Sequence, residues 1–409
     1  MRRFCTVSIG LIAAVAAIAA TGPTAQVRPA TPPQVSVLPL PDVPGAHAIW
    51  GATGQDARGH IWLGVTTDGI SPNSAHLFEH IPETGEFIDR GNVVAELERA
   101  GLRRAGEQQA KIHSRIIPGP DNYLYFASMD EDGERADGSQ LPTWGGHLWR
   151  MNLSTYRWEH LLRTPEALIA VGGGDRLIYA LGYFGHVLYQ YDTRTGRTSR
   201  VEVGSVDGHI SRNVLVDRRG HAYVPRVSVE PGVQGAARQI RVTLVELDAT
   251  LHEVHQTPID TSHYMGSTRP TGAHGIIGLQ MMQDGSILFT THVGRLLRVV
   301  PPDTGANAAD LVDLTWVHPG GTSYAPSLFT ADAATSLSSL AKRRGAGWEW
   351  VACTWPALMC DVTSIEIAGL PPAAINRALL YGSSTRDSTG GHYVVGMGNG
   401  YRPMVLRIR

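Results

Sequence analysis

A short turn-and-strand phrase recurs along this chain and constrains its fold more than any other feature. In each copy a polar turn is followed by an apolar run that mostly ends on an aromatic residue, as in residues 58–62, 121–125, 175–179, 219–223 and 284–288. Self-similarity at about 40 to 50 residues is typical of a β-propeller, in which each repeat is one blade of four strands. No stretch shows a long, capped helical period, so we expect an all-β chain.

These signals divide the chain into seven units and predict a seven-bladed β-propeller with four-stranded antiparallel blades. The units lie near residues 46–92, 112–162, 165–203, 209–259, 273–315, 323–366 and 374–409. Residues 34–40 are expected to supply a strand that closes the ring against the last blade. Two insertions interrupt the repeats: residues 93–111 are Ala-rich, charged and expected to be helical, and residues 129–144 form an acidic loop.

The N-terminus has the pattern of a secretory signal peptide. Arg2 and Arg3 precede an apolar stretch over residues 7–20, which is too short to remain as a membrane span. We expect residues 1–25 to be removed and residues 26–409 to form a single propeller domain that is secreted or periplasmic. In such an oxidising compartment Cys353 and Cys360 are expected to form a disulfide across a hairpin, with a thiolate metal site as the alternative.

Composition excludes some classes of partner. The 409 residues carry a formal net charge of −2, so no overall field attracts nucleic acid or an anionic membrane. The 46 glycines and 25 prolines favour many turns. Seventeen histidines are many for this length, so we examined their positions.

Histidines recur at two positions of the repeat that share one face of a propeller. The innermost strand of a blade and the third strand both start on that face, so residues at their starts converge. His47, His113, His209 and His274 lie at first-strand starts, and His76, His147, His186 and His392 at third-strand starts. An imidazole at a third-strand start is equally well explained by packing, which we favour for His76 and His392. We expect His60, His160, His252 and His255 to be ordinary surface or edge residues.

Two segments place a histidine beside an arginine at the entrance of an inner strand. His113 and Arg115 lie in residues 111–116, and His209 and Arg212 lie in residues 208–213. A guanidinium is costly to bury without an anionic partner, and its planar fork fits a carboxylate. The alternative is an internal Arg–Asp pair.

Imidazoles, a tyrosine and an arginine around one cleft are what β-elimination on a uronic acid requires. Tyr183 lies on the rim of the same face. Arginine would neutralise the carboxylate, a base of suitable pKa would remove the adjacent proton, and an acid would protonate the leaving oxygen. Glycoside hydrolysis instead needs two carboxylates at a set separation, and Asp130, Glu131 and Asp207 fit that role weakly.

Residues 109–115, 125–126, 145–149 and 182–186 resemble the blades of seven-bladed propeller polysaccharide lyases, namely ulvan lyases and rhamnose–glucuronate lyases. The resemblance is good over residues 109–226 and generic elsewhere. It implies an exported lyase that cleaves a uronate-containing polysaccharide or oligosaccharide. By motif, it implies the catalytic set His113, His147, Tyr183 and Arg212.

The intervals from His113 to His147 and from Tyr183 to Arg212 are longer here than in that family. Arg115 or Arg226 is therefore an alternative for the arginine that neutralises the carboxylate. The expected substrate-binding residues are Arg115, His209, His274, Arg226, Trp144 and His47. No cofactor is expected, and a structural metal held by His186, His209 or His221 stays an open alternative. A non-catalytic propeller that binds a glycan or protein on the same face is the second hypothesis, and a metal- or quinone-dependent oxidoreductase ranks last.

Overall fold

The computed structural model describes residues 32–135, 137–206, 208–230, 239–266, 273–303, 307–330, 335–367, 370–398, 400 and 402–409. The expected signal peptide, residues 1–25, and Asp207 lie outside these residues. The chain divides into residues 1–31 and a compact unit of residues 32–409. Only the second unit is described below.

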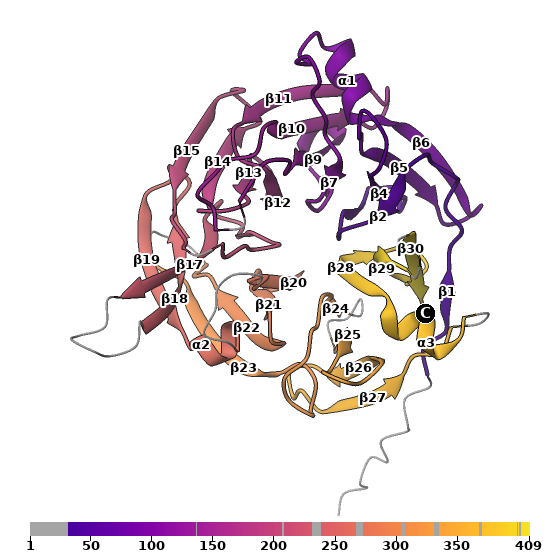
Figure 1. The fold of residues 1–409 in the computed structure, drawn as a ribbon. Helices are drawn as coiled ribbons and strands as arrows, with labels where there is room; N and C mark the ends of the chain where they lie inside the picture. Colours follow the sequence, from indigo (N-terminus) through magenta and orange to yellow (C-terminus); the bar gives the residue numbers. More distant parts are fainter. Residues whose placement is uncertain are drawn as a thin grey trace, which may run out of the picture. The chain divides into compact units, whose positions relative to one another are not determined.

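Seven antiparallel sheets are arranged in a ring, which confirms the predicted seven-bladed propeller (Figure 1). Blade 1 contains β2 (Ala46–Ala48), β3 (Thr53–Gln55), β4 (Ile61–Thr67), β5 (His76–Ile81) and β6 (Glu86–Asn92). Blade 2 contains β7 (Lys111–Ile112), β8 (Ile117–Pro118), β9 (Tyr123–Asp130), β10 (Gly145–Asn152) and β11 (Trp158–Thr164). Blade 3 contains β12 (Leu168–Gly173), β13 (Leu177–Gly182), β14 (Val187–Asp192) and β15 (Thr198–Glu202).

The other four blades follow the same plan. Blade 4 contains β16 (Leu215–Val216), β17 (Ala222–Glu230), β18 (Gln239–Leu247) and β19 (Glu253–Ile259). Blade 5 contains β20 (Ile276–Met281), β21 (Ile287–Thr291), β22 (Arg295–Val300) and β23 (Asp310–Trp316). Blade 6 contains β24 (Phe329–Thr330), β25 (Ser336–Lys342), β26 (Trp348–Thr354) and β27 (Cys360–Ser364), and blade 7 contains β28 (Leu379–Arg386), β29 (His392–Met397) and β30 (Pro403–Ile408).

The ring is closed by the N-terminal strand, as predicted. Strand β1 (Val35–Val37) pairs antiparallel with β30, with Val35 opposite Ile408. It completes blade 7 as the outermost strand. The first and last parts of the described unit therefore share one sheet, which ties its two ends together.

The recurring phrase owes its pattern to the hydrophobic core. Its aromatic residues Trp62, Tyr125, Tyr179 and Tyr223 are all buried, with at most 2% of their surface exposed. Each lies on the second strand of its blade and packs in a cluster of buried residues that draws on more than one blade. An aromatic side chain buries about 150–250 Å², so one per blade contributes much of the inter-blade packing.

Residues 93–111 were expected to be helical, and the first part of this segment is. Helix α1 (Val93–Arg99) begins after Asn92, whose side chain accepts a hydrogen bond from the backbone N–H of Ala95. The other short helices are η1 (Pro120–Asn122), α2 (Thr261–Tyr264) and α3 (Pro372–Arg377). In the described part of the chain no helix is long and apolar enough to cross a membrane.

The two remaining cysteines form the predicted disulfide. Cys353 and Cys360 are opposite each other in the β26–β27 hairpin and are bonded, with Cα atoms 4.0 Å apart. The thiolate metal site is therefore wrong for these residues, because their sulfur atoms are used in the bond.

Candidate active site at the channel mouth

The inner strands of the blades are interrupted, and the interruptions direct side chains into the central channel. In blade 1 residues 49–52 separate β2 from β3, and in blade 2 residues 113–116 separate β7 from β8. The inner strands of blades 3, 5 and 7 have register shifts where they pair with the second strand. A β-bulge bends the strand and re-aims its side chains, and such breaks are common beside functional sites.

The interruptions bring three of the predicted site residues to one narrow cavity. His113, Arg115 and Arg212 line it, although they come from blades 2 and 4. The rest of the wall includes Trp50, Gly51, Asn213, Ile277, Tyr324, Pro326, Tyr381 and Gly382. Of the expected catalytic set, the cavity wall contains His113 and Arg212, together with the alternative arginine Arg115, but not His147 or Tyr183.

Arg212 is held only by neutral groups among the described residues. Its Nε donates to Nδ1 of His274 at 3.2 Å, and its Nη1 donates to the Trp50 carbonyl at 3.1 Å and lies 3.3 Å from Nε2 of His113. Its guanidinium also lies over the Tyr381 ring, 4.3 Å from the ring centre. The internal Arg–Asp pair considered from the sequence is therefore not found here, and the cation retains its full charge for a ligand.

The two imidazoles beside Arg212 are neutral. A guanidinium can only donate hydrogen bonds, so the facing nitrogens of His113 and His274 must be unprotonated acceptors. Burial and the charges of Arg212 and Lys111 hold the pKa of His113 well below its usual range. Burial and the Arg212 charge lower the pKa of His274 to about 2.

Tyr183 is in the wall of neither the narrow cavity nor the larger cleft described below, but the Arg212 charge acts on it and it keeps its proton. Burial raises the pKa of its hydroxyl above the usual value; the charges of Glu131 and Glu134 raise it further, while the Arg212 charge lowers it. Tyr183 follows β13, and its N–H donates to the Ala167 carbonyl at 2.7 Å. Its phenol is therefore in the protonated form that a general acid needs.

The acidic loop between β9 and β10 contributes two carboxylates near Tyr183. Glu131 forms an ion pair with Lys111, and Glu134 has an oxygen that is buried without a hydrogen-bond partner among the described residues. Burial and the Glu131 charge raise the pKa of Glu134 to about 8. Glu134 was not among the expected site residues, because nothing in its local sequence pattern shows that the loop buries it.

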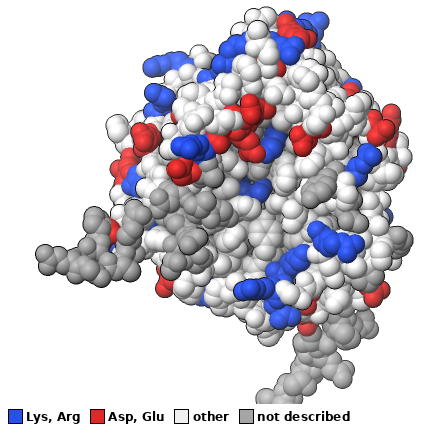
Figure 2. All heavy atoms as spheres, in the orientation of Figure 1, with Lys and Arg blue, Asp and Glu red and all other residues white. Residues whose placement is uncertain are grey.

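A larger cleft opens beside the channel over blades 5 to 7. It has a volume of about 770 Å³, and it shares His274, Tyr324 and Tyr381 with the Arg212 cluster. Trp348 lies in its wall and Lys342, Arg343 and Arg344 at its edge. Figure 2 shows basic side chains gathered over the blade 6 strands and acidic ones toward blades 2 and 3. Aromatic walls with basic groups suit an acidic sugar.

The fourth predicted catalytic residue, His147, lies apart from this cluster. It is fully buried, its Nδ1 lies 2.9 Å from Nε2 of His160, and its Nε2 lies 3.1 Å from Glu107. Arg104 and Arg163 form ion pairs with the same carboxylate. Both ring nitrogens of His147 are thus engaged in a network toward the outside of blade 2, and His160 belongs to that network rather than to the ordinary surface.

The other expected binding residues are mostly engaged elsewhere. Arg226 donates to the Val203 carbonyl and pairs with Glu253, while Arg104 lies over the Trp144 ring. His47 lies on β2 with its ring 6.2 Å from that of Trp50. Of the six expected binding residues, only Arg115 and His274 are part of the Arg212 cluster.

His186 and His209 form a separate buried pair between blades 3 and 4. Nδ1 of His186 lies 2.8 Å from the Pro225 carbonyl, and the two nitrogens of His209 contact Ser205 and Tyr264. Their rings are 4.9 Å apart, and burial lowers the pKa of His186 to about 4. With both nitrogens of His209 already bonded, this pair does not form a ready metal site.

The third-strand histidines His76 and His392 have the packing roles favoured from the sequence. His76 pairs with Asp89, and the His392 ring stacks on Phe329 with 4.3 Å between ring centres.

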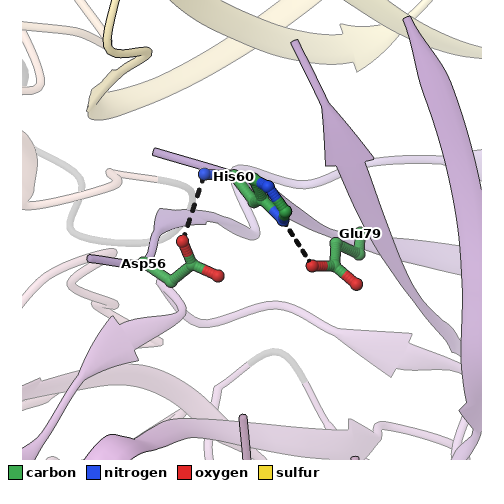
Figure 3. Close-up of side chains that lie close together, drawn as sticks. All are labelled: Asp56, His60 and Glu79. Carbon is green, nitrogen blue, oxygen red and sulfur yellow. Dashed lines mark hydrogen bonds and ion pairs between the residues drawn. The ribbon is translucent and has the colours of Figure 1, made fainter. Parts of the chain in front are cut away.

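Two groups of carboxylates and histidines on the opposite side of the blades have the spacing of metal ligands. Asp56, His60 and Glu79 form the first, and the His60 ring lies 2.6 Å from Glu79 (Figure 3). Arg58 contacts Asp56 at 2.6 Å and Glu79 at 2.7 Å. Arg58 bridges the two carboxylates, and Arg90 pairs with Glu79 at 2.5 Å, so two cations balance two anions. We call this ion-paired group a clasp; His60 belongs to it and is not an ordinary surface residue.

The second group repeats the same clasp in blade 4. Asp217, His221 and Glu246 correspond to the first group, and Arg219 contacts both carboxylates at 2.7 and 2.8 Å. Both clasps close the turn between the inner and second strands. The involvement of His221 in a metal site therefore gains no support from its surroundings.

Comparison with known proteins adds information on the fold alone. No family model and no curated protein matches the chain. Solved structures with a similar chain path include the complex of KlAtg21 with the coiled coil of AgAtg16 (TM-score 0.48, 10% identity, 88% of this chain and 98% of that one). Sqt1 of Saccharomyces cerevisiae is similar with a TM-score of 0.47 and 9% identity, over 91% of this chain and 97% of that one. The periplasmic gluconolactonase PpgL of Pseudomonas aeruginosa is similar with a TM-score of 0.44 and 13% identity, over 85% of this chain and 98% of that one. The resemblance to polysaccharide lyases thus remains an expectation.

Proposed function

We propose that this protein binds an acidic oligosaccharide at the channel mouth and cleaves it by β-elimination next to a uronate carboxylate. The observation that carries the proposal is the Arg212 guanidinium, which only neutral groups contact among the described residues. Its planar fork matches a carboxylate, and the cleft beside it has aromatic walls and a basic edge.

The protonation states near Arg212 fit elimination. Pairing of Arg212 with the carboxylate makes the C5 proton of the uronate more acidic and stabilises the developing enolate. His113 is a neutral imidazole, and its Nε2 becomes available as the base when Arg212 turns to the substrate. Tyr183 is protonated and supplies the proton to the leaving oxygen as the C4–O bond breaks and the C4–C5 double bond forms. Burial keeps His113 unprotonated and Tyr183 protonated, which are the forms that a base and an acid must start from.

We assign His147 no role in the reaction, although the resemblance to polysaccharide lyases implied a catalytic one. Its two nitrogens are engaged with His160 and Glu107. His274 is the second imidazole beside Arg212, and we assign it a positioning role because it accepts from Nε of the guanidinium.

A non-catalytic propeller that binds an acidic glycan is the second candidate. It is favoured by one observation: His113 and His274 both lie against Arg212, where each holds the cation in place. Both candidates place the carboxylate at Arg212. For either, we propose a secreted or periplasmic location, which is supported by the disulfide and by the N-terminal sequence.

The two candidates are separated by the ultraviolet absorbance of the unsaturated uronate that elimination forms. The purified protein is incubated with a panel of uronate polysaccharides, in parallel with His113→Gln, Tyr183→Phe and the control His252→Gln, whose residue is exposed on the outer side of blade 4. The lyase proposal predicts rising absorbance that only the first two variants lose. A flat trace on every substrate that the protein binds would refute elimination and leave the binding propeller.

A further inference from the structure

The central channel contains more hydrogen-bond donors than acceptors. Arg115 and Arg212 both line the narrow cavity between the interrupted inner strands. Arg115 donates to the Ser384 hydroxyl at 3.1 Å, and neither arginine contacts a carboxylate among the described residues. Two cations thus face one small space whose other described walls are neutral.

Two further donors in the same wall lack partners. The hydroxyl of Tyr324 and Nε1 of Trp50 are buried, and neither has a hydrogen-bond partner in the described part of the chain. A buried donor left unpaired costs about 1–3 kcal/mol, so such atoms usually mark a bound group. An indole N–H can only donate, so a ligand shared by these groups must accept.

The charge of Arg115 leads to the same conclusion. Burial lowers the pKa of its guanidinium to about 10, since no anion compensates the charge within the described structure. Burying an unpaired charge is strongly unfavourable. A bound anion would remove this penalty.

The size of the cavity restricts what can bind. It has room for about one water-sized sphere. A chloride ion is only slightly larger than a water molecule, whereas a carboxylate with its attached carbon, a sulfate or a phosphate is much larger. We propose that the central channel binds a single monovalent anion of halide size, chloride under ordinary conditions, between Arg115, Arg212 and Tyr324.

This anion site goes beyond the proposed elimination and does not depend on it. It lies in the channel between the inner strands and uses Arg115, which is not in the wall of the cleft over blades 5 to 7. It shares Tyr324 with that wall and Arg212 with the proposed carboxylate anchor. An anion here would connect the segments of blades 2 and 4 that carry Arg115 and Arg212. We expect it to stabilise the propeller whether or not a sugar is bound.

Bromide tests the site directly, because it replaces chloride and scatters anomalously. Crystals of the wild-type protein are soaked in sodium bromide. The proposal predicts an anomalous peak within hydrogen-bond distance of Arg115 and Arg212. Bromide on the outer surface with none in the channel would overturn it.

Thermal unfolding at constant ionic strength provides a second test. The melting temperature should be several degrees higher in sodium chloride than in sodium methanesulfonate, because the methanesulfonate anion is too large for the cavity. Arg115→Met should abolish the difference, and Arg194→Met, at an exposed arginine of blade 3, should retain it. Equal melting temperatures of the wild type in both salts would contradict the proposal. Stabilisation by formate but not by halide would also overturn it and assign the cavity to a carboxylate.

Discussion

Replacement of Arg212 by methionine tests the carboxylate anchor, because the variant keeps most of the side-chain length and removes the charge. In the free protein Arg212 donates to His274 and Trp50 and lies against His113 at 3.1 to 3.3 Å. Loss of these contacts leaves neutral acceptors, which water at the cleft can satisfy. We therefore expect Arg212→Met to fold.

The expected loss of activity follows from two hydrogen bonds. A guanidinium fork makes two charge-assisted bonds to a carboxylate, each contributing about 1.5–3 kcal/mol. The fork must first leave its present partners, so we expect a net loss of about 3–4 kcal/mol in transition-state stabilisation. This corresponds to a fall of about 10²- to 10³-fold in kcat/KM. Arg212→Lys keeps the charge but not the fork, and we expect an intermediate loss.

The assay is the initial rate of ultraviolet absorbance on the best substrate of the panel. The matched control is Arg226→Met, since Arg226 is also half-buried but pairs with Glu253 away from the channel. Its kcat/KM should stay within about twofold of wild type, as is usual for sites that the transition state does not contact. If Arg212→Met retained wild-type kcat/KM, or if Arg226→Met lost as much, the carboxylate anchor would be misassigned.

Three further predictions concern the acidic loop, the disulfide and the clasp of blade 4. Burial raises the pKa of Glu134 to about 8, so its carboxyl is neutral below that pH and negative above it. Repulsion between this charge and an acidic substrate should raise KM about fivefold above pH 8. KM measured over a pH series should show no such rise for Glu134→Gln. Replacing Cys353 and Cys360 together by serine should lower the free energy of unfolding by about 2–3 kcal/mol in urea titrations, because the bond closes a short loop. Glu246→Gln should cost about 3–5 kcal/mol in the same titration, since it leaves the partly buried Arg219 without one of its two carboxylates.

Each of these three has a clear contradicting result. A KM that rises equally in Glu134→Gln would show that another group titrates. Unchanged urea midpoints in the double serine variant or in Glu246→Gln would show that the hairpin bond or the clasp contributes little to stability.

The fold could be predicted from the sequence because its repeat is a direct consequence of core packing. An aromatic residue, such as Trp62 or Tyr179, occupies the same position of the repeated phrase because it fills the space between neighbouring blades. The closing strand could also be predicted, because an unpaired apolar segment before the first blade must pair with the last.

The site could be predicted only in part. His113 and Arg212 were found from short motifs at the entrance of inner strands; His113 lies between β7 and β8, and Arg212 lies just before β16. The environment of His147 could not be foreseen, since its partner Glu107 lies 40 residues away in an insertion without a repeat pattern. The raised pKa of Glu134 likewise arises from how a long loop folds, which local sequence does not encode.

The basic edge of the cleft could not be placed from the sequence for a related reason. Lys342, Arg343 and Arg344 form a short basic run in the sixth unit, whose repeat signature is the weakest, so their position beside the cleft was not evident.

The most direct test of the central claim is a crystal structure of the Tyr183→Phe variant with an acidic oligosaccharide from the panel. The account predicts a uronate carboxylate paired with Arg212, its C5 hydrogen directed at His113, and the chain extending into the cleft of Tyr324 and Trp348. An oligosaccharide bound elsewhere on the propeller, with Arg212 still donating to His274 and Trp50, would contradict it.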